Sequence, residues 1–218
     1  MSDNPVELGK MDVIFLCTKG NNLPQVCQSM APLIKKDTLV IPLLNGILAT
    51  NTLRDLLPTC ILCDGVVKTF SHIEATGHVV EDGGFLAMIL GMQGGHNPAL
   101  LYDLADIVAK AGIDITVTDK IELESWQKLA ITGTMSAIFC YYNGNAGYCN
   151  AQVDHETIVP SAYRELQAVA AANGVTIPDK FINRLITSFY KYPPTTISSL
   201  YRDLRNGKSW KDTELDLM

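Results

Sequence analysis

Short apolar runs alternate with amphipathic stretches in the first part of the chain. Three apolar runs end in polar or glycine-containing turns, a pattern typical of strands buried on both faces of a sheet. They are residues 11–17 (MDVIFLC), 38–44 (TLVIPLL) and 61–67 (ILCDGVV), with helices predicted between them at 23–34 and 49–57. Pro42 inside the second run indicates a sheet edge or a local irregularity, because proline cannot donate to a strand ladder. The alternation of strand and helix predicts a parallel α/β sheet.

The next stretch predicts an antiparallel element and then a return to the sheet. Residues 77–81 and 85–91 flank Asp82-Gly83-Gly84, which indicates a β-hairpin with a glycine turn. His78 lies in the first strand of this hairpin and is best interpreted as a hydrogen-bonded strand residue, not as a ligand or base. Residues 98–111 follow an amphipathic helix pattern that ends at Gly112, and residues 113–117 predict a last short strand.

The second half of the chain is predicted to be all-α. Helices are expected at 122–139, 155–173 and 178–190, with a glycine- and asparagine-rich loop at 143–150. After Asp119 the sequence shows no further strand pattern. We therefore place a domain boundary near residue 120, which divides the chain into an α/β domain at 1–120 and a helical domain at 121–218.

A polar row crosses the first of these helices, which is otherwise apolar almost all round from Leu129 onward. Glu124, Lys128, Thr132 and Ser136 are spaced four apart, so they share one helix face. A lysine at the edge of an apolar helix has to reach water, find a partner or face a polar cleft. Spacing alone favours a surface ion pair between Glu124 and Lys128.

Composition narrows the class of protein. Hydrophobic residues make up 47% of the 218 residues and charged residues 18%, which excludes a disordered chain. The net charge of −6 and the lack of a basic patch argue against a nucleic-acid partner. No apolar run approaches the roughly 20 residues that span a bilayer, and the N-terminal MSDNPVELGK is polar. We therefore expect a cytoplasmic protein with reduced thiols and no membrane partner.

The six cysteines predict no metal or redox site. Cys60 and Cys63 form a lone CxxC in TCILCDG. A structural zinc site needs a second pair of ligands, and a redox CxxC needs a helix N-terminus to stabilise the thiolate. This pair instead opens an apolar strand-like run, which favours buried structural cysteines.

Several segments, taken in order, resemble the ketopantoate reductase (2-dehydropantoate 2-reductase) family. They are DVIFLCTK at 12–19, LLNG at 43–46, residues 68–91 with their Thr-Gly-His turn, SWQKLA at 125–130, SSLYRD at 198–203 and TELD at 213–216. The resemblance implies part of a Rossmann-type parallel sheet in an N-terminal dinucleotide-binding domain. It also implies a helical, 6-phosphogluconate-dehydrogenase-like C-terminal domain that carries substrate-binding and catalytic residues. The implied reaction is NADPH-dependent reduction of 2-dehydropantoate, or a similar 2-keto acid, in pantothenate and coenzyme A biosynthesis.

The resemblance also implies roles for individual residues. Lys128 matches the catalytic lysine, which acts as general acid, and Glu214 matches a glutamate near the reacting hydroxyl. Substrate-binding positions match Asn45, Asn145 and Ser199, and cofactor-binding positions match Lys19 and Asn45. Simpler interpretations stay open: a turn at Asn45-Gly46, a solvated cation at Lys19, a helix cap at Ser198 and Ser199, and a surface charge at Glu214.

The chain departs from the family pattern in two ways. It contains no GxGxxG, the turn that normally binds a dinucleotide pyrophosphate, and it lacks the family's terminal helix after Met218. We therefore expect a chain incomplete at both ends, either a fragment or one with a misassigned start. Thr132 and Ser136 stand where the family usually has asparagine, which suggests an altered substrate or a divergent paralogue. The alternative function is therefore a non-catalytic helical module for dimerisation or binding, without dinucleotide binding. A homodimer is compatible with either function.

Overall fold

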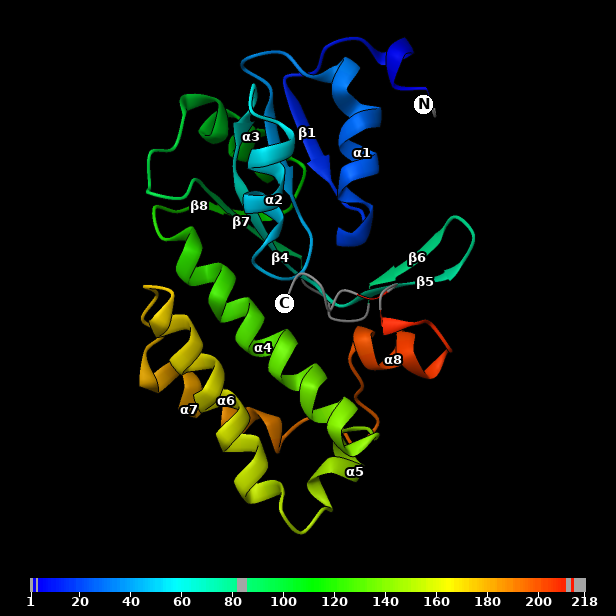
Figure 1. The fold of residues 1–218 in the computed structure, drawn as a ribbon, viewed down its shortest axis with the longest axis vertical. Helices are drawn as coiled ribbons and strands as arrows, with labels where there is room; N and C mark the ends of the chain where they lie inside the picture. The colour runs from blue at the N-terminus through cyan, green and yellow to red at the C-terminus, as the bar shows by residue number, and fades with distance from the viewer. Residues whose placement is uncertain (1, 3, 82–85, 211–212, 214–218) are drawn as a thin grey trace. The chain divides into compact units, whose positions relative to one another are not determined.

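The computed structural model describes residues 2, 4–81, 86–210 and 213, and it divides the chain into two compact units (Figure 1). The first unit contains Met1–Thr18, Asn22–Leu44 and Ala49–Glu124. The second contains Ser125–Met218 together with two short segments, Lys19–Asn21 and Asn45–Leu48. Two loops of the α/β half therefore belong, by their contacts, to the helical unit.

The first unit contains the predicted parallel sheet. Its strands are β1 (Val13–Leu16), β2 (Leu39–Pro42) and β3 (Ile61–Leu62), in the order β1-β2-β3. The connections contain α1 (Leu23–Met30), which continues as a 3-10 turn at Ala31–Leu33, and α2 (Ala49–Leu56). Further 3-10 turns lie at Pro5–Leu8 and Gly20–Asn22. The parallel α/β fold predicted for this half is confirmed.

Pro42 is not in an edge strand, so the first of the two interpretations was wrong, and the local irregularity is the one that the structure supports. β2 is the central strand of the three, and all four of its residues are buried. Pro42 is the last residue of β2, and β3 pairs only with Leu39 and Val40, so the ladder on that side has ended before the proline. At this position the missing backbone N–H of proline removes no hydrogen bond from the ladder. β1 instead lies at the edge of the described sheet, where Phe15 is 38% exposed, so β1 is not buried on both faces as predicted.

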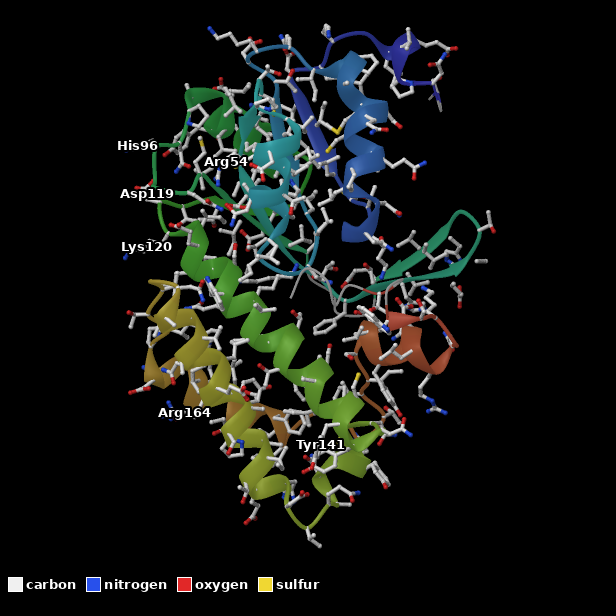
Figure 2. The ribbon with its side chains drawn as sticks, in the orientation of Figure 1. Arg54, His96, Asp119, Lys120, Tyr141 and Arg164 are labelled. Atoms are coloured by element: carbon white, nitrogen blue, oxygen red, sulfur yellow. The ribbon has the colours of Figure 1, made fainter. Side chains whose placement is uncertain are left out.

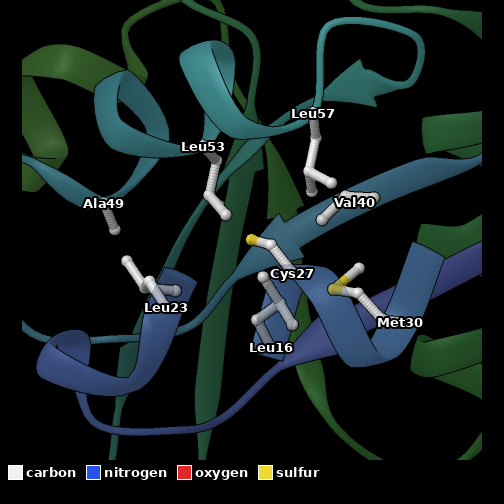
Figure 3. Packing of buried hydrophobic residues seen from close by; sticks show 8 residues of the cluster. All are labelled: Leu16, Leu23, Cys27, Met30, Val40, Ala49, Leu53 and Leu57. Carbon is white, nitrogen blue, oxygen red and sulfur yellow. The ribbon is translucent and has the colours of Figure 1, made fainter. Parts of the chain in front are cut away.

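Alternate residues of β2 supply the cores on the two faces of this sheet, as expected for a strand with period two. Val40 packs with residues of α1 and α2 in one cluster, which Figure 3 shows from close by: Leu16, Leu23, Cys27, Met30, Val40, Ala49, Leu53 and Leu57. Leu39 and Ile41 pack on the other face with Cys63 and with residues of the next sheet and helix: Met88, Leu90, Leu101 and Leu104. Packing on both faces holds the carboxyl ends of β1 and β2 in place.

The predicted third strand, residues 61–67, is two strands that separate at Cys63. The second part, β4 (Asp64–Lys68), pairs antiparallel with β7 (Ala87–Gly91), which in turn pairs parallel with β8 (Asp114–Val117). Helix α3 (Ala99–Lys110) connects β7 to β8 and ends before Gly112 (φ +86°), as predicted.

Asp82, Gly83 and Gly84 lie outside the described residues, but the strands on either side of them pair with other strands and not with each other, so the predicted hairpin was wrong. The hairpin joins β5 (Ser71–Ala75) to β6 (His78–Glu81), and Gly77 at φ +78° supplies the left-handed turn. Apolar β7 pairs inside the sheet instead, because its Met88 and Leu90 are buried there. His78 is a strand residue whose Nδ1 lies 2.9 Å from the Glu74 carboxylate, which matches its predicted structural role.

The second unit consists of helices over its described residues. They are α4 (Ile121–Tyr142, whose first four residues belong to the first unit), α5 (Ala146–Asn150), α6 (His155–Ala172), α7 (Asp179–Phe189) and α8 (Ser199–Arg205). The loop predicted at 143–150 was wrong, because Asn145 caps α5 by accepting a hydrogen bond from the Tyr148 N–H at 2.9 Å. None of the described helices is long and apolar enough to cross a membrane.

Candidate functional site

The polar side chains of the row on α4 have different partners and different degrees of burial. Glu124 pairs with Lys68 on β4, with 3.3 Å between carboxylate and ammonium, so the structure gives it another partner than the predicted Lys128. Lys128 is partly buried, and its carbonyl oxygen accepts a hydrogen bond from the Thr132 hydroxyl at 3.0 Å. Ser136, one turn further on, is only 2% exposed. The face that carries Lys128 therefore leads from a partly exposed helix start into the helical core.

Lys19 and Asn45 follow the carboxyl ends of β1 and β2, where parallel α/β sheets bind ligands. Both residues belong to the second unit. The Lys19 ammonium lies 3.1 Å from the carboxylate of Asp203 on α8, and its side chain is 36% exposed, so Lys19 is not the solvated loop cation considered as an alternative. The chain bends at Asn45-Gly46, where Gly46 has φ +92°, in agreement with the turn considered for this dipeptide.

Helix α8 presents Ser199 and Asp203 on one face, because they are four residues apart. Ser198 is the helix cap, and its hydroxyl accepts the Tyr201 N–H at 3.1 Å. Ser199 is exposed at the first position of the helix. The cap is thus confirmed for Ser198 alone, and the Ser199 hydroxyl is not the one that caps the helix.

Asp203 is held by two lysines. Lys208 donates to Oδ1 at 2.7 Å, and Lys19 donates to Oδ2 at 3.1 Å. Burial opposes ionisation of this carboxyl, but the hydrogen bonds from Lys208 and Lys19 outweigh burial and lower its pKa. The family resemblance covers SSLYRD but implies no role for its Asp203. The signal that could have revealed it is its position one helical turn after Ser199.

Asn145 lies close to the segment that leads into α8. The backbone N–H groups of Ala146 and Gly147 donate to the carbonyl oxygens of Thr196 and Pro194, at 3.0 Å each. The Asn145 Oδ1 caps α5, and its amide N–H₂ is the donor group that this side chain could present to a ligand. Hydrogen bonds therefore connect the two residues after Asn145 to the chain before Ser199. Glu214 lies outside the described residues.

A second polar cluster lies within the first unit and was missed in the sequence. The Thr50 hydroxyl on α2 donates to the Asp64 carboxylate at the start of β4. Arg54, also on α2 (labelled in Figure 2), donates to Gln93 at 2.9 Å and to Asn51 at 2.9 Å. Burial raises the pKa of Asp64, against the effect of hydrogen bonds from Thr50 and Gln93. This cluster ties α2 to β4 and to the loop after β7.

Cysteines and metal ligands add no further site among the described residues. All six cysteines are free, and the Cys63 thiol is buried and donates to the Gly91 carbonyl at 3.2 Å. Burial raises the pKa of Cys63 to about 12, so it is an inert structural thiol. Within the described part of the chain, no group of three or more His, Cys, Asp or Glu side chains could hold a metal ion.

Two family models match this chain in sequence order. "Ketopantoate reductase PanE/ApbA" matches residues 2–95, and "Ketopantoate reductase PanE/ApbA C terminal" matches residues 120–218. The chain belongs to the ketopantoate reductase family. The expected fold class, part of a Rossmann-type sheet followed by a helical C-terminal domain, is confirmed together with the family.

Individual relatives of this ketopantoate reductase family member align with it in sequence or structure over most of its length. The 2-dehydropantoate 2-reductase of Streptococcus pyogenes serotype M6 is 26% identical over 207 residues, which cover 95% of this chain and 66% of the relative. The chain thus spans just under two thirds of that relative. A ketopantoate reductase structure from Ralstonia eutropha superposes with TM-score 0.82 at 26% identity, covering 96% of this chain and 68% of that one. A complex of D-mandelate dehydrogenase with NADH gives TM-score 0.80 at 25% identity, covering 95% and 70%.

Proposed function

We propose that the natural protein containing residues 1–218 reduces 2-dehydropantoate, or a similar 2-keto acid, to the 2-hydroxy acid with NADPH, on the route to pantothenate and coenzyme A. Family membership supports the reaction class. The single structural observation that carries the proposal is the composition of the second unit. Among the described residues, it contains each one that the resemblance marks as functional, including Lys19 and Asn45 from loops that follow β1 and β2.

The chemistry of these side chains suits the reaction. A hydride added to the ketone carbon leaves negative charge on oxygen, and an ammonium can stabilise that charge and donate the proton. We assign this role to Lys128, whose partial burial suits a lysine that has to lose its proton. We assign Glu214 to the reacting hydroxyl, as the family resemblance implies. Ser199, an exposed residue, and Asn145, through its amide N–H₂, would orient the substrate.

The residues present fit part of a nicotinamide dinucleotide. When bound, that cofactor supplies the hydride. An ammonium at Lys19 and an amide at Asn45 would contact it from the carboxyl ends of two adjacent parallel strands. The 218 residues contain no GxGxxG, so the pyrophosphate has no such glycine turn within them. Because one structural relative was solved with NADH, the choice between NADPH and NADH is part of the test.

The same proposal covers organisation and location. Residues 1–120 would form the partial dinucleotide-binding domain and residues 121–218 the substrate-binding and catalytic domain. We further propose a cytoplasmic enzyme that can form a homodimer; a Staphylococcus aureus relative of this fold is described as a dimeric ketopantoate reductase.

The first experiment replaces Lys128 in the natural protein. We expect Lys128→Ala to lower kcat for 2-dehydropantoate by about 100-fold or more, because general acid catalysis contributes on that order. Turnover is measured by loss of NADPH or NADH absorbance. Lys120→Ala is the matched control, since Lys120 is an exposed lysine just before α4 and should leave kcat unchanged.

One outcome would contradict the role of Lys128, and another would contradict the reductase assignment as a whole. Unchanged turnover of Lys128→Ala would remove Lys128 from the mechanism. A wild-type protein that reduces neither 2-dehydropantoate nor related 2-keto acids with either cofactor would overturn the reductase assignment and favour the non-catalytic helical module.

A further inference from the structure

Asp203 joins two parts of the chain that are far apart in sequence. Its Oδ2 accepts a hydrogen bond from Lys19, 184 residues earlier, and its Oδ1 accepts one from Lys208, five residues later. The Asp203 side chain is only 16% exposed, whereas the two lysines are 36% and 47% exposed. The carboxylate is therefore the most buried member of the cluster, and it holds the more exposed ammonium of Lys19 by a hydrogen bond.

The position of Asp203 on α8 determines where the Lys19 ammonium is held. Asp203 is one helical turn after Ser199, so both side chains project from the same face. The hydroxyl of Tyr201, on the same helix, donates a hydrogen bond to the side-chain Oδ1 of Asn143 at 3.3 Å. This bond fixes α8 against the turn between α4 and α5. The ion pair thus brings an ammonium to the face of α8 that presents the Ser199 hydroxyl.

Stability alone is a poor explanation for this pair. A partly exposed ion pair contributes roughly 0–1 kcal/mol to folding. A long lysine side chain, by contrast, has many rotamers, and a charge-assisted hydrogen bond to a fixed carboxylate restricts them. The main physical effect of Asp203 on Lys19 is therefore orientation.

We propose that Asp203 is a positioning residue that holds the Lys19 ammonium beside Ser199, ready to bind an anionic group of the ligand. The inference rests on the proposed function, in which Lys19 and Ser199 contact cofactor and substrate. The recognised chemistry is an anionic oxygen group. Two sources supply it, namely the carboxylate of the 2-keto acid and a phosphate of the dinucleotide.

A double-mutant cycle tests this in the natural protein. We expect Asp203→Asn and Lys19→Met each to weaken ligand binding about tenfold, with kcat changed less than about twofold, because orientation affects binding and not the proton transfer at Lys128. The double variant should be no weaker than either single variant, since both remove the same interaction. Asp203→Glu, which keeps the carboxylate, should restore part of the affinity.

The control removes a comparable charge elsewhere in the same unit. Asp179 forms a 2.8 Å ion pair with Arg164, and Asp179→Asn should leave Kd, KM and kcat unchanged. Separate measurements of the Kd for the cofactor and the KM for the 2-keto acid distinguish the two sources of the anionic group. A rise in the Kd for NADPH or NADH assigns the anion to the cofactor phosphate, whereas a rise in the KM for the 2-keto acid assigns it to the substrate carboxylate.

The failing outcomes are distinguishable. Additive losses in the double variant, accompanied by a lower melting temperature, would mean a structural role and overturn the inference. Wild-type affinity in Asp203→Asn would overturn it as well, with the reductase proposal still standing. A wild-type protein that binds neither cofactor nor 2-keto acid would overturn both, and the wild-type titration alone would reveal this.

Discussion

Asp64 is a buried carboxyl whose surroundings oppose its charge. Burial is the largest influence and raises its pKa above 3.8, the ordinary value, while the Thr50 and Gln93 side chains stabilise the ionised form only in part. The folded protein therefore binds this proton more tightly than the unfolded chain does. Between the two pKa values stability falls as the pH rises, and at neutral pH the full destabilisation is present.

We therefore expect Asp64→Asn to raise the free energy of unfolding at pH 7, because a neutral amide at this buried position carries no charge that burial opposes. The asparagine oxygen can still accept the Thr50 hydrogen bond. The gain should shrink as the pH falls toward 4, because the wild-type carboxyl then becomes neutral. Urea unfolding of both proteins at several pH values measures it.

Asp55→Asn is the control for this prediction, because Asp55 lies on the same helix and is exposed. It should change stability little and without this pH dependence. A less stable Asp64→Asn at pH 7 would show that hydrogen bonding to the carboxylate outweighs its burial.

Elements with a strong local signal were predictable from sequence, and elements decided by distant partners were not. The amphipathic pattern and Gly112 predicted α3, and the four apolar residues of β2 predicted a buried strand. The hairpin was misplaced because Asp82-Gly83-Gly84 is as good a turn signal as Thr76-Gly77. Burial of Met88 in the sheet decides between them, and no local pattern reports it.

Gly91 lies where the end of β7 packs closely against the connection from β8 to α4. It is the last residue of β7, and a Cβ there would lie 2.4 Å from the Thr118 carbonyl oxygen and 2.9 Å from the Ile121 Cβ. Ile121 is fully buried at the start of α4. Neither atom can move without shifting the connection from β8 to α4, so the close approach requires glycine.

Gly91→Ala should therefore destabilise the protein by about 1–3 kcal/mol, as overpacking typically does. Thermal or urea unfolding measures the loss. Thr116→Ala, at an exposed position of neighbouring β8, is the control and should cost much less. Equal stability of Gly91→Ala and the wild type would mean that the end of β7 and the start of α4 can separate without cost.

At the scale of the whole chain, the helical unit is discontinuous in sequence. Family resemblance selected Lys19, Asn45, Lys128, Asn145 and Ser199, and all of them fall in that unit. A boundary near residue 120, drawn from the change in periodicity, could not include Lys19–Asn21 or Asn45–Leu48, because their grouping depends on contacts and not on local pattern. Asp203 escaped notice for the same reason, since its partner Lys19 is 184 residues away.

The polypeptide of residues 1–218 by itself should bind NADPH only weakly. Pyrophosphate binding normally depends on N–H groups of a glycine turn at a helix N-terminus, and no GxGxxG occurs in these residues. Lys19 and Asn45 can contribute at most a few interactions, so we expect a dissociation constant well above the low micromolar range. Titration followed by NADPH fluorescence measures it, with the 2-dehydropantoate 2-reductase of Streptococcus pyogenes as the positive control. A low-micromolar constant for residues 1–218 would contradict the expectation. It would mean that the loops after β1 and β2, together with the helical unit, supply most of the binding energy without a glycine turn.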